Sequence, residues 1–222
     1  MPDVSFLEIP LLSPTDRLVA LPPVRLSDSA TGAAPRLSTS LRVGLRGDAL
    51  CVRFDARDED VVATLTERDA PLWTEDVCEV FLSPDDPARV YYEFEVNPLG
   101  TVFDARVESP DLSRATMRVD TGWACPGFTA RVTRRPNRWS ASLTIPLASL
   151  CRGERPPGVW RANFYRVDRG APDEFSAWSP THADPPDFHV PERFGILRLP
   201  ETTGPLRARG STRPRDPGPA SP

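Results

Sequence analysis

Two tryptophans lie in polar segments of the chain. Trp73 stands in DAPLWTED and Trp178 in EFSAWSPTH, each beside charged residues or proline. An indole ring is costly to expose, so it either packs against the core or offers its flat face to a ligand. An apolar ring flanked by hydrogen-bonding side chains suits a pyranose, whose C–H face is apolar and whose rim carries hydroxyl groups. We therefore expect Trp73 and Trp178 to be the stacking faces of a site for a mono- or oligosaccharide.

A glutamate lies inside one of the apolar strands that the sequence predicts. Glu79 stands in VCEVFL, so Val77 and Phe81 share its strand face. A carboxylate on such a face is costly to bury unless it is paired or borders a cavity. We expect Glu79 to supply directional hydrogen bonds to the ligand. Four further side chains are candidate companions, as donors to Glu79 or to the ligand: Arg106, Asn163, Tyr165 and Arg166.

Catalytic chemistry has no recognisable motif in this chain. The GxSxG, HExxH and P-loop patterns are all missing. Acidic residues are common between positions 55 and 95, but a glycosidase needs two carboxylates that face each other across a cleft. The sequence therefore predicts a non-catalytic protein, with a hydrolase favoured only if facing carboxylates emerge in a cleft.

Two segments hold metal-binding residue types without a metal-binding spacing. In SPTHADPPDFHV, two histidines and two aspartates lie close together, at His182, Asp184, Asp187 and His189. They could ligate a transition metal, but the prolines between them stiffen the loop, and we expect the ring nitrogens to bond backbone groups. The oxygen-rich turn at residues 55–60 could take calcium, although it lacks EF-hand spacing. The residues alone therefore assign no metal site.

Apolar residues alternate with polar ones along most of the chain. The alternating runs cover residues 41–45, 50–54, 61–65, 78–82, 90–96, 128–132, 139–145, 160–164 and 195–199. A two-residue period places the apolar side chains on one face of a strand. Short strands separated by turn signals are typical of antiparallel sandwiches and barrels. We therefore predict an all-β fold, an antiparallel β-sandwich, with one helical turn near residues 147–150.

Composition divides the chain into three zones. Residues 1–22 form a proline-rich lead-in, residues 23–200 carry the alternating runs, and residues 201–222 are rich in proline, glycine, arginine and serine. The last zone has too little apolar surface to offset the entropy of ordering, so we predict a disordered tail. The four cysteines form no CxxC pair. We expect them to be apolar fillers, with a single Cys51–Cys78 bridge as the alternative.

Charge and hydropathy argue against two classes of partner. The formal net charge is −4, whereas nucleic-acid binding favours a basic face. No run of apolar residues is long enough to span a membrane. The N-terminal segment carries acidic residues and prolines where a signal peptide has a basic start and an unbroken apolar run. We therefore expect a cytoplasmic protein without nucleic-acid or membrane partners.

Six segments together resemble carbohydrate-binding module family 9, in its stand-alone family 9-like form. They are PLWTEDVCEVFLSP, YYEFEVNPLGTVFDAR, RWSASLTIPLASL, WRANFYR, SAWSPT and DFHVPERFGILRL. They occur in this order, and the resemblance extends from Leu26 to Leu199. It implies a jelly-roll β-sandwich related to the DOMON domains, which agrees with the alternation.

In the sugar-binding members of that family, two loop tryptophans clamp a sugar ring and polar side chains bond its hydroxyls. By motif, Trp73 matches the first tryptophan, Glu79 matches the acidic residue six positions later, and Trp178 matches the second tryptophan. The resemblance also implies structural calcium, whose ligands it does not place in this chain, and no other cofactor. Family modules are commonly attached to secreted xylan-degrading enzymes, whereas this chain shows neither a catalytic domain nor an export signal.

Two alternatives from other classes stay open. The first is a structural or protein-interaction sandwich without sugar affinity, in which Trp73 and Trp178 lie far apart or are both buried. The second follows from the DOMON relationship and is a haem-binding redox domain, with haem held by methionine and by lysine or histidine. The chain has no lysine, and its methionines are Met1 and Met117. Met117 lies in RATMRVD, which fits an ordinary strand position.

Overall fold

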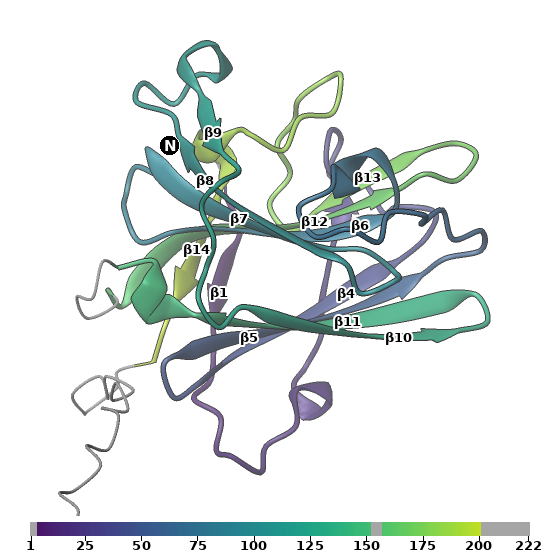
Figure 1. Ribbon diagram of the computed structural model, residues 1–222, viewed down its shortest axis with the longest axis horizontal. Coiled ribbons are helices and arrows are strands. Elements are labelled where there is room, and N and C mark those ends of the chain that lie inside the picture. Colours follow the sequence, from purple (N-terminus) through teal and green to yellow (C-terminus); the bar gives the residue numbers. More distant parts are fainter. Residues whose placement is uncertain (1–3, 152–156, 201–222) are drawn as a thin grey trace, which may run out of the picture.

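The computed structural model describes residues 4–151 and 157–200. Two β-sheets pack face to face, and the helical parts among the described residues are single 3₁₀ turns. In Figure 1 the smaller sheet lies below the larger one, and the loops that carry β9 and β13 rise above the larger sheet. The predicted all-β sandwich is confirmed, whereas the predicted disordered tail lies outside the described residues.

The larger sheet carries most of the strands. Its order is β1 (Phe6–Glu8), β14 (Gly195–Arg198), β12 (Val159–Asp168), β6 (Val77–Ser83), β7 (Val90–Val96), β8 (Val102–Glu108) and β9 (Arg118–Asp120). On its edge, β13 (Glu174–Ala177) pairs with β12 and with β3 (Ser27–Asp28). The pairing is antiparallel except between β1 and β14. Part of the proline-rich lead-in therefore belongs to the sandwich.

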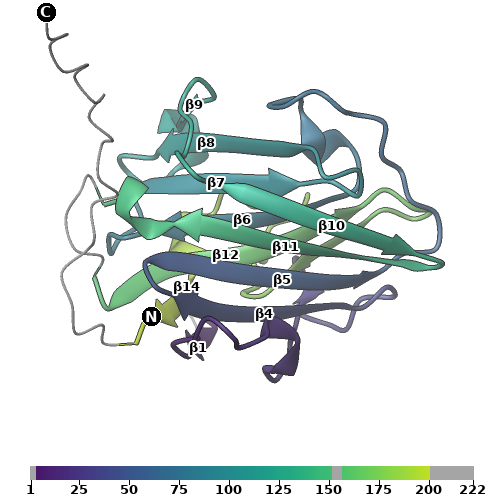
Figure 2. The same ribbon diagram turned by 60° about the horizontal axis from the view of Figure 1, so that its bottom comes forward.

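The smaller sheet is a five-stranded antiparallel layer. Its order is β10 (Thr129–Arg135), β11 (Arg138–Pro146), β5 (Ala49–Arg57), β4 (Thr39–Arg46) and β2 (Val24–Arg25), and Figure 2 shows β10, β11, β5 and β4 side by side. The 3₁₀ turns are η1 (Leu18–Ala20), η2 (Leu72–Thr74), η3 (Arg114–Thr116), η4 (Leu147–Ser149) and η5 (Pro191–Arg193). The turn η4 falls where one helical turn was expected.

The main core fills the space between the two sheets. From the larger sheet it takes Cys78, Val80 and Leu82 of β6, which are fully buried, as the alternation predicts. Phe164 of β12 meets Phe54 of β5 edge-on, with ring centroids 6.4 Å apart. No disulfide links the four cysteines, so the alternative Cys51–Cys78 bridge is not formed. Cys51, Cys78 and Cys125 are buried, as expected of apolar fillers, and Cys151 is partly buried.

A second apolar cluster covers the outer face of the larger sheet. It includes Phe81, Tyr91, Phe103 and Tyr165, together with loop residues such as Phe188. Both faces of β6 are therefore buried along its whole length. In β6 the sequence already showed apolar residues on both faces, whereas in β7 the alternation indicated one buried face only. The loops that cover the outer face of β7 come from distant parts of the chain.

One predicted strand is absent, and six strands were not expected. Residues 61–65 form a loop, since the backbone N–H of Val62 donates to Asp76 Oδ2 at 2.6 Å and that of Thr64 donates to Glu75 Oε2 at 2.6 Å. These carboxylates satisfy the amides that a neighbouring strand would otherwise bind. The unexpected strands are the short β1, β2, β3, β9 and β13 and the longer β8. Among the described residues, no helix is long and apolar enough to cross a bilayer.

Candidate functional site

A cavity of about 420 Å³ opens on the outer face of the larger sheet. Its floor is made by side chains of β6, β7 and β12, and its walls by η2, β8, β13 and the loop before η5. Volumes of about 300–1,000 Å³ are typical of small-molecule sites. The loops that bury the outer face of the sheet therefore leave a hollow of ligand size between them.

Trp73 supplies one aromatic wall of the cavity. Its side chain lies on η2 and is 43% exposed. The indole meets Phe103 of β8 edge-on, with centroids 5.4 Å apart and an interplanar angle of 75°. The backbone carbonyl of Trp73 accepts a hydrogen bond from Arg169 Nη2 at 2.8 Å. The ring is thus held at one edge, while much of its surface stays open to solvent.

A second aromatic wall comes from Phe188 and Phe175. Phe188 stacks on Tyr165 with centroids 4.1 Å apart and planes 9° from parallel. The Tyr165 hydroxyl donates to the Phe188 carbonyl at 3.0 Å, which fixes the loop to the sheet. Phe175 meets Phe188 edge-on at 6.2 Å. Tyr165, a predicted site residue, therefore supports the wall from behind and does not line the cavity.

Two arginines at the cavity are held by ion pairs. Arg114 Nη1 lies 2.8 Å from Asp187 Oδ1, and Arg169 Nη1 lies 2.7 Å from Asp173 Oδ2. The Arg169 guanidinium also lies 5.1 Å from the centroid of the Phe175 ring. Arg114 and Arg169 both line the cavity, so they place hydrogen-bond donors beside the aromatic walls.

Three glutamates converge at the floor. Glu79 on β6 is directly opposite Glu95 on β7, and Glu93 is opposite Phe81 in the same register. Each of the three offers a carboxylate oxygen, and these three oxygens all lie within 4.8 Å of one another. All three residues are buried, and Glu79 and Glu93 border the cavity. Of the two outcomes that the sequence allowed for Glu79, pairing or a place beside a cavity, the structure shows the second.

Burial dominates the electrostatics of these glutamates. It raises the pKa of Glu79 and Glu95 well above the ordinary range, and the nearby Glu93 carboxyl raises both further. Burial raises the pKa of Glu93 to about 7, against the opposing effects of Glu95 and Arg114. Removing a carboxylate from water disfavours its charged form, and like charges nearby add to this effect.

His189 lies in the cavity wall beside Tyr91. The Tyr91 hydroxyl and His189 Nδ1 are 2.8 Å apart and share a hydrogen bond. Burial, and then the positive charge of Arg114, lowers the pKa of His189 to about 4, with Asp187 opposing. The imidazole is thus neutral at physiological pH. Met117 places its sulfur 3.6 Å from the same Tyr91 hydroxyl.

The expected pairing of Trp73 with Trp178 is wrong. Trp178 is only 5% exposed and belongs to the core between the sheets. Its ring meets Phe164 edge-on at 5.5 Å and covers Gly195, where a Cβ would collide with the indole. The backbone N–H of Trp178 donates to the Phe164 carbonyl at 2.9 Å, so sheet pairing draws this residue into the core.

Arg166 is also a structural residue. Alternate side chains of a strand point to opposite faces, and Arg166 lies on the inner face of β12, away from the cavity. Its Nη2 is 3.0 Å from Asp58 Oδ2 and 2.5 Å from Asp168 Oδ2, and its Nη1 donates to the Arg57 carbonyl at 2.5 Å. Asp58 also accepts a hydrogen bond from Trp139 Nε1 at 3.0 Å. Arg166 thus neutralises buried aspartates rather than a ligand.

Asn163 and Arg106 do not reach the cavity either. The Asn163 amide makes two hydrogen bonds to the backbone of Ser179, at 2.8 and 2.9 Å, so its polar atoms are already used. Arg106 is opposite Tyr92 in the β7–β8 register, and its Nη1 lies 2.5 Å from Glu108 Oε1. Because Phe103 faces the cavity, strand alternation turns Arg106 the other way.

Of the seven predicted site residues, the cavity therefore brings together Trp73 and Glu79. Residues that sequence reasoning did not place there are Glu93, Phe175, Phe188, Arg114, Arg169 and His189. A usable signal existed for Glu93. Since Val77 and Phe81 give β6 a second apolar face, residues of the next strand that share this face are buried with it.

In the part of the chain that the structure describes, neither of the two segments that hold metal-binding residue types forms a group of three potential metal ligands. His182 Nδ1 pairs with the Ala30 carbonyl at 2.9 Å, as expected for a ring that bonds backbone. In the 55–60 turn, Asp55 is held by Arg42, at 2.7 Å, and by Arg53, at 2.6 Å. Its oxygens are therefore engaged by guanidinium groups and do not fit a calcium ion. Within the described residues, the three floor glutamates form the one group of three potential ligands.

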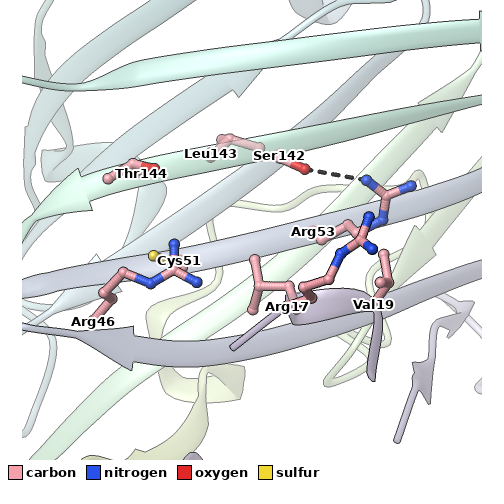
Figure 3. A pocket seen from close by; sticks show the side chains of 9 residues that line it. Arg17, Val19, Arg46, Cys51, Arg53, Ser142, Leu143 and Thr144 are labelled. Carbon is pink, nitrogen blue, oxygen red and sulfur yellow. Dashed lines mark hydrogen bonds between the residues drawn. The ribbon is translucent and has the colours of Figure 1, made fainter. Parts of the chain in front are cut away.

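A second, more open hollow of about 260 Å³ lies on the smaller sheet. Figure 3 shows Arg17, Arg46 and Arg53 around Cys51, with Arg53 bonded to Ser142. This hollow has no aromatic ring in its lining. It therefore lacks a stacking surface for a sugar ring, and the larger cavity is the better candidate.

Known proteins resemble this chain in sequence or in fold. The sequence is 28% identical, over 179 residues, to the "Extracellular protein" of Arthroderma benhamiae (strain ATCC MYA-4681 / CBS 112371), covering 72% of this chain and 78% of that protein. A solved structure of a candidate carbohydrate-binding protein from Bacteroides uniformis ATCC 8492 has a TM-score of 0.73 at 18% identity, covering 89% of this chain and all of that one.

Two further solved structures are of a carbohydrate binding module family 9 from Caldicellulosiruptor kristjanssonii. The cellotriose complex has a TM-score of 0.61 at 14% identity and covers 96% of this chain and all of that one. The glucose complex has a TM-score of 0.61 at 13% identity and covers 92% of this chain and all of that one. At these identities the likeness shows the fold. The profile of "Carbohydrate-binding family 9" matches residues 26–199, and the chain therefore belongs to this family.

Proposed function

We propose that this protein binds a mono- or oligosaccharide, without catalysis, in the cavity on the outer face of the larger sheet. The observation that carries the proposal is the placement of a half-exposed indole, Trp73, beside the buried carboxyl group of Glu79 in one cavity. Membership of a carbohydrate-binding family supports it. The complexes of the Caldicellulosiruptor module with cellotriose and glucose support the same class of ligand.

The cavity has the two kinds of surface that a sugar requires. The rings of Trp73, Phe175 and Phe188 offer apolar area for the C–H face of a pyranose. The carboxyl groups of the floor accept hydrogen bonds from hydroxyls, or donate them when protonated, and Arg114 donates from the rim. This replaces the predicted pair of tryptophans with one tryptophan and two phenylalanines.

The expected affinity is modest. A monosaccharide has about 12 heavy atoms, and about 0.3–0.5 kcal/mol per atom gives about 4–6 kcal/mol. This corresponds to a Kd from about 1 mM to tens of micromolar. Each further sugar unit that contacts the rim would tighten binding within the same limit per atom.

The carboxyl arrangement supports binding rather than hydrolysis. Glycosidases place an acid on one side of the scissile bond and a nucleophile or base on the other. Here Glu79, Glu93 and Glu95 come from neighbouring positions of two adjacent strands. They therefore approach a ligand from the same side. The proposal is accordingly a binding module that leaves the glycosidic bond intact.

Isothermal titration calorimetry with glucose, cellobiose, xylose and xylobiose tests the proposal. We expect at least one of these sugars to bind the wild-type protein in the range above, and Trp73→Ala to weaken that binding at least tenfold. The matched control is Phe6→Ala, which removes an aromatic ring that is 53% exposed and packs on Arg198 outside the cavity. A wild-type protein that gives no heat with any of the four sugars, or equal affinities for both variants, contradicts the proposal.

A further inference from the structure

The three glutamates at the cavity floor lack a positive partner. No described ion pair includes Glu79, Glu93 or Glu95. The nearest candidates, Arg114 and Arg169, are paired with aspartates at the rim. Several buried carboxylates elsewhere in the fold do have partners, as the pairing of Asp58 with Arg166 illustrates. The floor is therefore a local excess of acidic groups.

Glu95 provides a second, independent indication of a missing partner. It is fully buried, and neither of its carboxyl oxygens has a hydrogen-bond partner among the described residues. Glu93 could donate to it only if one of the two carboxyl groups were protonated. Buried polar atoms are almost always satisfied, and an unsatisfied one calls for an explanation such as an ion or water. Glu95 shares the cluster with the two glutamates that border the cavity.

The geometry fits one cation. Ligand oxygens lie 2.3–2.6 Å from a calcium ion, so oxygens bound to the same ion are at most about 5 Å apart. One oxygen from each glutamate falls within 4.8 Å of the others. The donor set is made only of carboxylate oxygens, which hard cations such as Ca²⁺ and Mg²⁺ prefer over softer metals.

We propose that Glu79, Glu93 and Glu95 bind one hard divalent cation of the size of Ca²⁺ at the floor of the cavity. Glu95 is the buried anchor, and Glu79 and Glu93 hold the ion from the side that borders the cavity. Calcium takes 6–8 oxygen ligands, and three carboxylates leave positions that face the open cavity. In the free protein, water would complete the coordination of the ion.

The ion would also explain how an acidic floor serves a neutral ligand. If the proposed function holds, sugar hydroxyls can replace the waters on the open side of the cation. The ion would then bind the three glutamates on one side and the sugar hydroxyls on the other, while the aromatic walls contact the sugar ring. This second step rests on the proposed sugar binding, whereas the cation site itself does not.

Calorimetric titration of CaCl₂ into protein stripped with EDTA tests the site directly. We expect one ion per chain, at pH 7, for the wild type. Calcium at 100 times its Kd should raise the melting temperature by about 5–10 °C, because a ligand that binds only the folded state stabilises it. Glu95→Gln should weaken calcium binding at least tenfold. The matched control Glu108→Gln changes a glutamate of the neighbouring strand β8 that pairs with Arg106, and it should bind like the wild type.

The calcium and sugar titrations test the cation site and the sugar-binding function separately. The cation site is overturned if the folded wild-type protein gives no heat on titration with CaCl₂ and no rise in melting temperature. Protonation of the three glutamates would then neutralise their charge. Equal calcium affinity in Glu95→Gln and wild type also overturns it. If Glu95→Gln does not fold, Glu93→Gln serves as the second variant with the same expected loss. Sugar titrations in EDTA and in calcium complete the test. If calcium binds but sugar affinity is the same with and without it, only the coupling of the ion to the sugar is rejected. If sugar binds but calcium does not, only the ion is rejected, and if calcium binds without any sugar heat, only the carbohydrate function is rejected.

Discussion

Replacing Trp178 by alanine should destabilise the fold strongly. The side chain is 5% exposed and packs against Phe164 and Gly195 in the main core. A tryptophan buries about 200 Å², and at about 25 cal/mol per Å² the lost burial is at most about 5 kcal/mol. Replacing a buried tryptophan by alanine typically costs about 3–5 kcal/mol. We therefore expect Trp178→Ala to lower the free energy of unfolding by about 3–5 kcal/mol.

The matched change is Trp73→Ala, which removes the same side chain from a different environment. Trp73 is 43% exposed, and its ring contact is the edge-on pair with Phe103. Such a pair contributes about 0.5–1.5 kcal/mol beyond area burial. With part of the ring already in water, we expect a loss of about 1–2 kcal/mol in the free energy of unfolding.

Guanidinium unfolding followed by far-UV circular dichroism measures both changes, since this signal does not depend on the tryptophan fluorescence that each variant loses. Trp178→Phe keeps an aromatic ring in the core and should bind sugar with the affinity of the wild type. Equal destabilisation by the two alanine variants would refute the assignment of Trp178 to the core. So would a folded Trp178→Phe protein that no longer binds sugar, because the second tryptophan would then belong to the binding site after all.

Three further outcomes follow from the same contacts. Gly195→Ala places a methyl group against the Trp178 ring and 2.7 Å from the Ser5 carbonyl oxygen, so chemical denaturation should show a loss of about 1–3 kcal/mol. Arg166→Met leaves two buried aspartates without their counter-charge, so the same measurement should show a loss of about 3–5 kcal/mol, and a neutral effect would contradict the buried network. His189 has its pKa lowered to about 4 in the folded state, whereas the unfolded chain takes up the proton near pH 6.5. The contribution of the neutral His189 side chain to the free energy of unfolding is therefore complete above pH 6.5 and is lost as the pH falls to 4. The difference in the free energy of unfolding between wild type and His189→Gln should shrink by about 2–3 kcal/mol over this range.

The alternation of apolar residues was sufficient to predict the sandwich. In β6 the residues Cys78, Val80 and Leu82 point into the main core, as their spacing indicates. The turn at Pro136 and Asn137 joins β10 to β11, and Asn137 has a φ of 57°, a left-handed conformation that asparagine tolerates better than most residues. These features depend on neighbours in the sequence, so a local reading captures them.

The outer face of the sheet was not predictable in the same way. Tyr91, Glu93 and Glu95 alternate with apolar residues and read as a solvent-exposed face, yet all are buried. The rings that cover this region, including Phe188, come from almost 100 positions further along the chain. Burial by a distant loop leaves no periodic pattern in the strand that it covers.

The two loop tryptophans show the same limit. Both stand beside charged residues and proline, and nothing local separates them. Trp178 directly follows β13, which pairs with β12, and its backbone bonds to Phe164. Trp73 lies on a 3₁₀ turn that is not part of the sheet. Strand pairing between residues far apart in the chain therefore decides which ring is buried and which borders the cavity.

The main core also fixes the geometry of the acidic floor. Because side chains alternate along a strand, a one-residue slip of β7 against β6 would move Phe94 out of the core and turn Glu93 and Glu95 into it. Two unpaired carboxyl groups between the sheets would cost several kcal/mol. The apolar residues on the inner face of β6 and β7 therefore hold the register that aligns Glu79 with Glu95 on the outer face. The register of the candidate site therefore depends on the core residues of β6 and β7, so a substitution such as Phe94→Ala should weaken ligand binding although Phe94 does not line the cavity.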